Sequence, residues 1–600
     1  MAGSFAVDAA RPVDAGVLAS MIEPLVHRGP DDRGLDFGDG FGLGFRRLSI
    51  VDLLGGKQPM RDCSGAIRSV VNGEIYNYKE LRAELLSRGC VFHTTCDVEV
   101  IPHLYEHYGE RFVEKLNGQF AIAIVDERQR RLVLARDHVG IAPLFYTIVD
   151  GTLLFASEIK ALLQHPGVPR AVDLVGLDQI LTWPGPVSPR TLFKGIASLP
   201  PGHLARFSAS GLTLKRYWDL DFPSNAAFQP ADYVSLVEEA LTAAVKDRLN
   251  ADVPVGFYLS GGLDSSLIAA LIHAQSPDQR RHSFSITFTD AAIDERRYQR
   301  MVAQRVGSIH HEREVTPAAI GEHLRRIVRC AEAPLRESYN ACSLILSGLA
   351  AEHGLKVILT GEGADEIFGG YVGYNLSRES ADDDLDELLE AQLRRKLFGD
   401  RNLFYEKNYR AASEVKRALY SKHIDPADVD CLVQAPVDHA QLIGRHPFHQ
   451  RSYLDFKLRL ADHLLADHGD RVAYANSVEV RYPFLDLRVI EAAKQIPPAL
   501  MNANGEEKAI LRRVAERHVP PAILERRKFS FVAPSSPHLL RDNEWLHDLL
   551  SRERIERQGY FDPDVVERLQ SQRADINQTF EDDLLMVVLT FAIFLEEFGL

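Results

Sequence analysis

The sequence predicts two unlike halves, an α+β domain followed by an α/β domain with a parallel sheet. Up to about residue 205, apolar segments such as 120–125 and 131–135 flank a turn, as paired strands do. Beyond residue 231, helical periods alternate with short apolar strands, which is typical of a parallel α/β core. A proline-containing polar stretch around 221–225 marks a linker, placed at 206–230. We therefore expect domains at 1–205 and 231–600, the second with a charged helical insert at about 376–450.

The composition restricts the classes of function. A chain of 600 residues with 46% hydrophobic residues is long enough for two or more folded domains. Its net charge of −15 argues against nucleic acid as a partner, because a phosphate backbone requires a basic face. The longest apolar run, Leu584–Leu595, is too short to cross a bilayer and predicts a buried terminal helix. With no signal segment and no CxxC pair among six cysteines, we expect a cytoplasmic protein without a disulfide framework or membrane contact.

The most informative segment, residues 259–266, lies between an apolar strand and a helix. It contains Leu259, Ser260, Gly261, Gly262, Leu263, Asp264, Ser265 and Ser266. Backbone N–H groups of such a glycine-rich loop cradle phosphate at the start of the helix. The lysine that a Walker A loop requires is missing. The segment instead resembles the pyrophosphate loop of enzymes that split ATP into AMP and pyrophosphate.

Three further segments follow in a fixed order: 356–370, then Asp470-Arg471 with 479–486, and finally 505–512. The first is a strand that ends in glycine-rich acidic sequence, at the sheet edge where open α/β sheets bind ligands. Together with the loop, these pieces resemble the synthetase half of glutamine-dependent asparagine synthetases over about residues 235–540. The resemblance implies that a carboxylic acid attacks the α-phosphorus of ATP, and that ammonia then displaces AMP from the acyl-adenylate.

The resemblance also implies roles for particular residues. Asp264 and Asp365 would hold Mg²⁺, and Lys508 would neutralise the departing phosphates. The pyrophosphate would lie on Ser260, Ser265, Ser266 and the amides of Gly261 and Gly262, while backbone at Leu259, Ile286, Thr360 and Gly361 would frame AMP. Glu362 would take a proton from the attacking amine. β-Lactam-forming relatives have tyrosine there, so a glutamate favours amide formation with ammonia.

Each assignment has a structural alternative. Asp264 could be a helix N-cap, Asp365 a turn residue, Lys508 a surface lysine and Glu362 a member of a salt bridge.

The first half resembles a class II glutaminase domain, an Ntn-type sandwich, over about residues 2–205. The matching segments are His27–Asp31, Arg47–Asp52, Asn72–Asn77, Thr95–Asp97 and Arg136–Gly140. The resemblance implies that Arg47 clamps the glutamine carboxylate, while Asp97 and Glu74 hold its amine. Asn72 and the Gly73 amide would form the oxyanion hole, and the Ile50-Val51 backbone a wall of the pocket.

Ala2 stands where this family has its nucleophilic cysteine. A methyl group cannot attack an amide, and the other cysteines lack the free amine that serves as base. This half is therefore expected not to hydrolyse glutamine. An engineered exchange is favoured because the rest of the pocket is chemically complete, and natural loss of the cysteine is the alternative.

Aspartate is the default acid by resemblance, with ammonia or glutamine as the nitrogen source. Residues 331–340 match the family loosely; Arg336 could bind a substrate carboxylate or form a surface ion pair. A specialised-metabolite acid and an amine-dependent relative with a vestigial glutaminase domain stay open. So does a non-catalytic glutamine sensor or scaffold, although residues 260–266, Asp365 and Lys508 argue against it. A homodimer is expected by resemblance alone.

Overall fold

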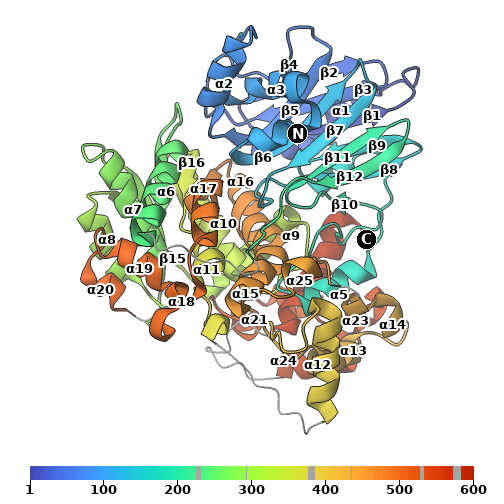
Figure 1. Cartoon of the computed structure of the whole chain (residues 1–600). Coiled ribbons are helices and arrows are strands. Elements are labelled where there is room, and N and C mark those ends of the chain that lie inside the picture. Colours follow the sequence, from blue (N-terminus) through green and yellow to red (C-terminus); the bar gives the residue numbers. More distant parts are fainter. Residues whose placement is uncertain (224–231, 292, 376–384, 434, 527–532, 572–582) are drawn as a thin grey trace.

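The strands form three sheets (Figure 1), in a computed structural model that describes residues 1–600 except 224–231, 292, 376–384, 434, 527–532 and 572–582. Two antiparallel sheets of six strands lie in the first half, in the orders β10-β8-β9-β1-β3-β2 and β12-β11-β7-β6-β5-β4. Their bounds are β1 Ala2–Ala6, β2 Asp32–Gly38, β3 Phe41–Arg47, β4 Met60–Arg61, β5 Ile67–Ile75, β6 Gly118–Asp126, β7 Arg131–Arg136, β8 Phe145–Val149, β9 Thr152–Ala156, β10 Ala197–Ser198, β11 His203–Ser208 and β12 Gly211–Arg216.

Strand β6 explains why these sheets stack. Its Ala121 and Ala123 point into a core shared by the two sheets, where Phe5 of β1 meets Phe207 of β11 with ring centroids 6.2 Å apart. The alternate residues, including Ile122, point into a second core beneath the helices α2 (Tyr78–Ser87) and α3 (Val100–Tyr108). Because both faces of the strand are buried, it is apolar at every position from 120 to 125.

Helices cover the outer face of the first sheet as well. These are α1 (Ala15–Ile22), α4 (Ile159–Leu162) and α5 (Leu174–Thr182). The first half is therefore a helix–sheet–sheet–helix sandwich, which confirms the predicted α+β architecture. The predicted boundary at residue 205 falls inside the β11–β12 hairpin, because residues 208–211 form a tight turn and the sheet continues to Arg216. The predicted linker is correspondingly shorter, and its residues 224–230 lie outside the described residues.

The second half contains the predicted parallel sheet, in the order β15-β14-β13-β16-β17. Its strands are β13 Val255–Tyr258, β14 His282–Phe288, β15 Ile309–Val315, β16 Val357–Leu359 and β17 Glu479–Arg481. Phe257 of the central strand pairs with Ser283 on one side and Leu359 on the other. The carboxyl ends of β13, β14 and β16 therefore meet at one edge, where the predicted ATP-binding segments begin.

Helices surround this sheet. They include α6 Tyr233–Arg248, α7 Leu263–Gln275, α8 Arg296–Arg305, α9 Pro317–Ala331, α10 Tyr339–Glu352, α11 Ala364–Phe368, α16 Arg471–Tyr474, α17 Leu487–Lys494 and α19 Ala509–Ala515. The described part of the predicted insert is helical, with α12 Leu385–Phe398, α13 Tyr409–Leu419 and α14 Pro426–Val429. After it, α15 (Pro447–Asp455) runs directly into the π-helix η7 (Phe456–Asp470).

The last helix joins the two halves. Helix α25 (Leu584–Phe598) is buried along most of its length, as the apolar run predicted. Phe594 and Phe598 each pack against Phe193 of the first half, with ring centroids 5.1 Å apart. One hydrophobic core therefore extends from the first sheet to the chain's final helix. Among the described residues, every helix falls short of the length and apolar character that crossing a bilayer requires.

Candidate active site

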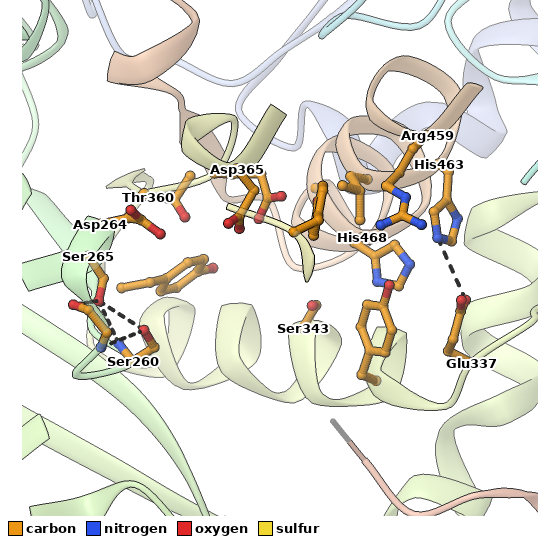
Figure 2. A pocket seen from close by; sticks show the side chains of 18 of the residues that line it. Ser260, Asp264, Ser265, Glu337, Ser343, Thr360, Asp365, Arg459, His463 and His468 are labelled. Carbon is orange, nitrogen blue, oxygen red and sulfur yellow. Dashed lines mark hydrogen bonds and ion pairs between the residues drawn. The ribbon is translucent and has the colours of Figure 1, made fainter. Parts of the chain in front are cut away.

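A cavity of about 720 Å³ opens at the carboxyl edge of the parallel sheet (Figure 2). Eight of the predicted ATP-binding residues line it, namely Leu259, Ser260, Gly262, Asp264, Ser265, Ile286, Thr360 and Gly361, together with Glu362, Asp365 and Lys508. Gly261 and Ser266 are the two predicted ATP-binding residues outside this lining. Gly261 faces α8, where a Cβ would come within 2.8 Å of the Gln299 amide, and the Ser266 side chain is fully buried in α7.

The loop at the start of α7 is held closed by its own serines. The Ser260 and Ser265 hydroxyl oxygens lie 2.9 Å apart. The Ser260 amide donates to the Ser265 hydroxyl and the Gly262 amide to the Ser260 hydroxyl, both at 3.2 Å. Gly361 packs on the loop so tightly that a Cβ there would lie 2.8 Å from the Ser265 amide. These contacts place hydroxyl and amide donors around the first turn of α7, an arrangement that suits phosphate.

Lys508 is the centre of charge in the cavity. Its Nζ lies 2.6 Å from a carboxylate oxygen of Asp264 and 2.7 Å from one of Asp365. The lysine is buried, with 3% of its surface exposed, and adopts a left-handed backbone with φ of 54° before α19. Burial disfavours its charge, but the two carboxylates outweigh that cost and raise the pKa of Lys508 above its ordinary value. Sequence segments separated by more than two hundred positions thus form one charged cluster.

The geometry also bears on the structural alternatives for the two aspartates. Gly262, rather than Asp264, is the N-cap of α7, and Asp264 lies in the first turn. Asp365 lies in the first turn of α11, after a left-handed Gly363 with φ of 91°. Both carboxylates face the cavity beside Thr360 (Figure 2).

Two glutamates next to this cluster hold their protons unusually tightly. Burial, followed by repulsion from Glu366, Asp365 and Asp264, raises the pKa of Glu362 to about 8. Burial and Asp365 likewise raise the pKa of Glu366 to about 7, although the Tyr371 hydroxyl donates a hydrogen bond to it. Among the described residues Glu362 forms no ion pair, so its carboxyl group is available to a ligand in the cavity. A carboxyl group that titrates near neutrality is suited to general acid–base work.

The far end of the cavity contains residues that the sequence analysis missed. Glu337, His463 and His468 come together there, away from the serine loop (Figure 2). Burial, and then the neighbouring His463, lower the pKa of His468 well below its ordinary value. The predicted candidate Arg336 lines the same cavity, where its guanidinium donates to the Ile180 carbonyl oxygen at 3.0 Å. Two histidines five positions apart match no common helical spacing, which left no signal in the sequence.

All seven predicted glutamine-binding residues line a second, smaller cavity of about 50 Å³ in the first half. They are Arg47, Ile50, Val51, Asn72, Gly73, Glu74 and Asp97. Tyr474 and Glu479 of the second half complete its wall. Ala2 is outside this lining: it begins β1, fully buried between Gly44 of β3 and Ala156 of β9.

The two residues of the predicted oxyanion hole, Asn72 and Gly73, both line this cavity. Gly73 adopts φ of 129°, and a Cβ there would come within 1.9 Å of the Gln119 carbonyl oxygen. Only glycine therefore fits at this position. The side-chain nitrogen of Asn72 is buried and finds no hydrogen-bond acceptor in the described part of the chain. A buried donor without an acceptor is costly, which favours a ligand oxygen at this point.

The predicted amine-binding pair, Glu74 and Asp97, is a buried pair of carboxyl groups that contacts the second half. Burial is the main cause that raises the pKa of both Glu74 and Asp97, and such a pair gains from a nearby cation. Arg481 of β17 approaches Glu74 to 3.1 Å. Arg47, by contrast, donates to carbonyl oxygens of its own loop, at 3.1 Å to Val51 and 2.6 Å to Asp52. The predicted carboxylate clamp is therefore occupied by the loop in this conformation.

Comparison with known proteins identifies the family. The sequence model of the family described as asparagine synthase matches residues 236–596, more than half of the chain. The chain belongs to the asparagine synthase family. The model of the glutamine amidotransferase domain matches residues 1–218, which include the whole helix–sheet–sheet–helix sandwich of the first half.

Relatives in this family span nearly the whole chain. Asparagine synthetase [glutamine-hydrolyzing] 3 of Bacillus subtilis (strain 168) is 32% identical over 552 residues, covering 89% of this chain and 86% of the relative. Asparagine synthetase [glutamine-hydrolyzing] 1 of the same organism is 31% identical, covering 92% of this chain and 89% of the relative. Amidase chyE of Penicillium rubens is 32% identical, covering 91% of this chain and 89% of the relative. The chain is thus an enzyme of the asparagine synthetase type, and ATP use is a property of this family.

Proposed function

We propose that the protein activates a carboxylic acid with ATP as an acyl-adenylate and passes the acyl group to ammonia, with aspartate as the default acid. The observation that carries the proposal is the contact of Lys508 with Asp264 and Asp365, at 2.6 and 2.7 Å. A buried cation between two carboxylates, beside a serine loop at a helix start, suits a triphosphate and its counter-ion.

The first half-reaction would occur at this cluster. An oxygen of the acid attacks the α-phosphorus, the bond to the bridging oxygen breaks, and pyrophosphate leaves towards Ser260 and Ser265. Lys508 neutralises charge on the leaving group. Asp264 and Asp365 offer hard oxygen donors for Mg²⁺, which neutralises phosphate charge when bound.

The second half-reaction needs a base. Glu362 lines the same cavity and its carboxyl group titrates near neutrality. We assign to it the proton that ammonia loses as its nitrogen attacks the acyl carbon and AMP leaves.

The glutaminase half would bind glutamine without hydrolysing it. The Asn72 side chain has no acceptor within the described residues and the Glu74–Asp97 pair lines the same cavity, whereas Ala2 offers no nucleophile. Free ammonia is then the nitrogen source of the chain as written.

A second candidate acid is larger than aspartate. The cavity of about 720 Å³ continues past the charged cluster to Trp183, Phe404 and Tyr409. Aromatic walls favour an apolar or aromatic portion on the acid. A specialised-metabolite acid would use this space, and an amine in place of ammonia is compatible with the same adenylate.

One experiment tests the proposal and separates the two acids. The protein is incubated with Mg-ATP, ammonium and a panel of carboxylic acids, and AMP release is measured. Acid-dependent AMP release supports activation, and the preferred acid identifies the substrate class. If no combination of acid and amine gave AMP release or pyrophosphate exchange, the proposal would be contradicted. That result would favour a non-catalytic glutamine-binding protein.

A further inference from the structure

Glu337, His463 and His468 form a compact group at the end of the cavity opposite the serine loop (Figure 2). One side-chain ligand atom of each lies within 4.8 Å of the others. The Nε2 atom of His463 and the Oε2 atom of Glu337 are 3.6 Å apart. Ligand atoms in a filled tetrahedral zinc site lie roughly 3.3–3.5 Å apart, from metal–ligand distances near 2.1 Å. Small side-chain rotations would therefore bring the group to coordination distance.

The π-helix η7 is what brings the two histidines together. In an α-helix, residues five apart point about 140° away from each other around the axis. In a π-helix each turn closes between residue i and residue i+5, so the fifth residue lies nearly above the first. His463 and His468 both belong to η7, which spans Phe456–Asp470. The unusual helix thus places two imidazoles on the same side, towards Glu337 of the segment before α10.

The group has unused ligand atoms. Both ring nitrogens of His468 and the Oε2 oxygen of Glu337 are inaccessible to water and have no hydrogen-bond partner within the described residues. An imidazole with neither nitrogen bonded costs free energy in a buried position. The deficit points to a ligand that accepts electron pairs from these atoms.

Neighbouring side chains orient both rings. The Nδ1 atom of His463 faces Asp467 at 3.9 Å, and Asp467 is itself fixed by Arg471 at 3.0 Å. The Nε2 atom on the other side of the ring faces Glu337. A carboxylate behind one ring nitrogen is the usual support of a histidine that binds metal through the other. The His468 ring is stacked on Tyr339, with centroids 4.1 Å apart.

We propose that Glu337, His463 and His468 form a zinc-binding site in the wall of this cavity. Two imidazole nitrogens and one carboxylate oxygen suit Zn²⁺, whereas Mg²⁺ prefers oxygen ligands alone. Three protein ligands leave a position open towards the cavity. That position takes an oxygen of the acid substrate remote from the carboxylate that is activated, a part of the inference that rests on the proposed function. The neighbouring Arg459 does not oppose the ion strongly, because Glu406 neutralises it at 2.7 Å.

The test uses the full-length protein, dialysed against a chelator and titrated with zinc chloride by calorimetry. We expect one equivalent to bind, and His463→Ala and His468→Ala each to weaken binding at least tenfold. The matched control is His311→Ala, which removes the partner of His282 (2.8 Å between ring nitrogens) from a separate histidine group at the sheet edge. It should leave binding unchanged. The proposal would be overturned if the wild-type protein bound no stoichiometric zinc. It would also be overturned if only His311→Ala, the control, lost zinc binding.

Cobalt(II) gives a readout that does not depend on the stability of any variant. Bound to wild-type protein, it should show the intense visible bands of a tetrahedral ion, and the preferred acid should change them. Octahedral-type spectra would overturn the three-ligand geometry, and bands unaffected by the acid would overturn the substrate contact.

Both measurements omit ATP, so failure to bind metal leaves the proposed amidation standing. Failure to release AMP likewise leaves the zinc result standing. If the histidine variants alter the KM for the acid while no metal binds, the histidines contact the acid directly and the metal proposal is wrong.

Discussion

Glu362→Gln should separate the two half-reactions. The substitution keeps size and hydrogen bonding but removes the ability to accept a proton. We expect acid-dependent exchange of pyrophosphate into ATP to survive, because Lys508, Asp264 and Asp365 are unchanged. Amide formation should fall by about 10²–10⁴-fold, the usual cost of losing a general base.

The pH profile supplies a second magnitude. With a pKa of about 8, Glu362 is about one-tenth ionised at pH 7 and about nine-tenths at pH 9. Raising the pH removes the proton and populates the base, so amide formation by the wild type should rise about tenfold over this range. Lys508 does not obscure the change, since its pKa is raised and it stays charged throughout. The variant should lack this rise.

The assay follows product with hydroxylamine as the acceptor, because this nucleophile is already neutral across the range and ammonia is not. Glu366→Gln is the companion variant, as Glu366 also titrates near neutrality. Equal loss of exchange and product in Glu362→Gln would show that the residue builds the adenylate site. If product formation still rose with pH in Glu362→Gln but not in Glu366→Gln, the role of base would belong to Glu366.

Four further outcomes are expected. Asp264→Ala should abolish pyrophosphate exchange, whereas Asp278→Ala on an exposed loop should leave it unchanged; exchange surviving in Asp264→Ala would refute its role. Ammonium but not glutamine should support AMP release. Ala2→Cys at a free N-terminus should restore glutamate release in a glutaminase assay, and glutamate release by the protein with Ala2 would contradict the reasoning. Calorimetry should detect glutamine binding that Arg47→Ala weakens by about 2–4 kcal/mol, and no binding at millimolar glutamine would indicate a decayed pocket. Chemical denaturation of Arg481→Met should lower the free energy of unfolding by about 3–5 kcal/mol, because buried carboxylates lose their cation, and an unchanged value would refute this.

The two halves, and the meeting of the segments that carry Asp264 and Asp365, could be predicted from sequence because their signals are local. Strands β13 and β16 are each followed at once by a glycine-rich segment that contains an aspartate, and parallel strands end at one edge of a sheet. Knowing the strands was therefore enough to expect these two segments at one edge, and the family resemblance then assigned Asp264 and Asp365 to the same ion. The apolar pattern of β6 likewise predicted a buried strand.

The tertiary structure decided the features that depend on contacts between distant segments. The approach of Arg481 to Glu74 joins residues from different domains, and no spacing in the sequence announces it. The cluster of Glu337, His463 and His468 requires a π-helix, which hydrophobic periodicity does not signal because such helices are rare. The raised pKa of Glu362 likewise arises from burial and from neighbouring carboxylates. Sequence determined which chemical groups the chain carries, whereas packing decided which of them face one another out of water and how their charges are tuned.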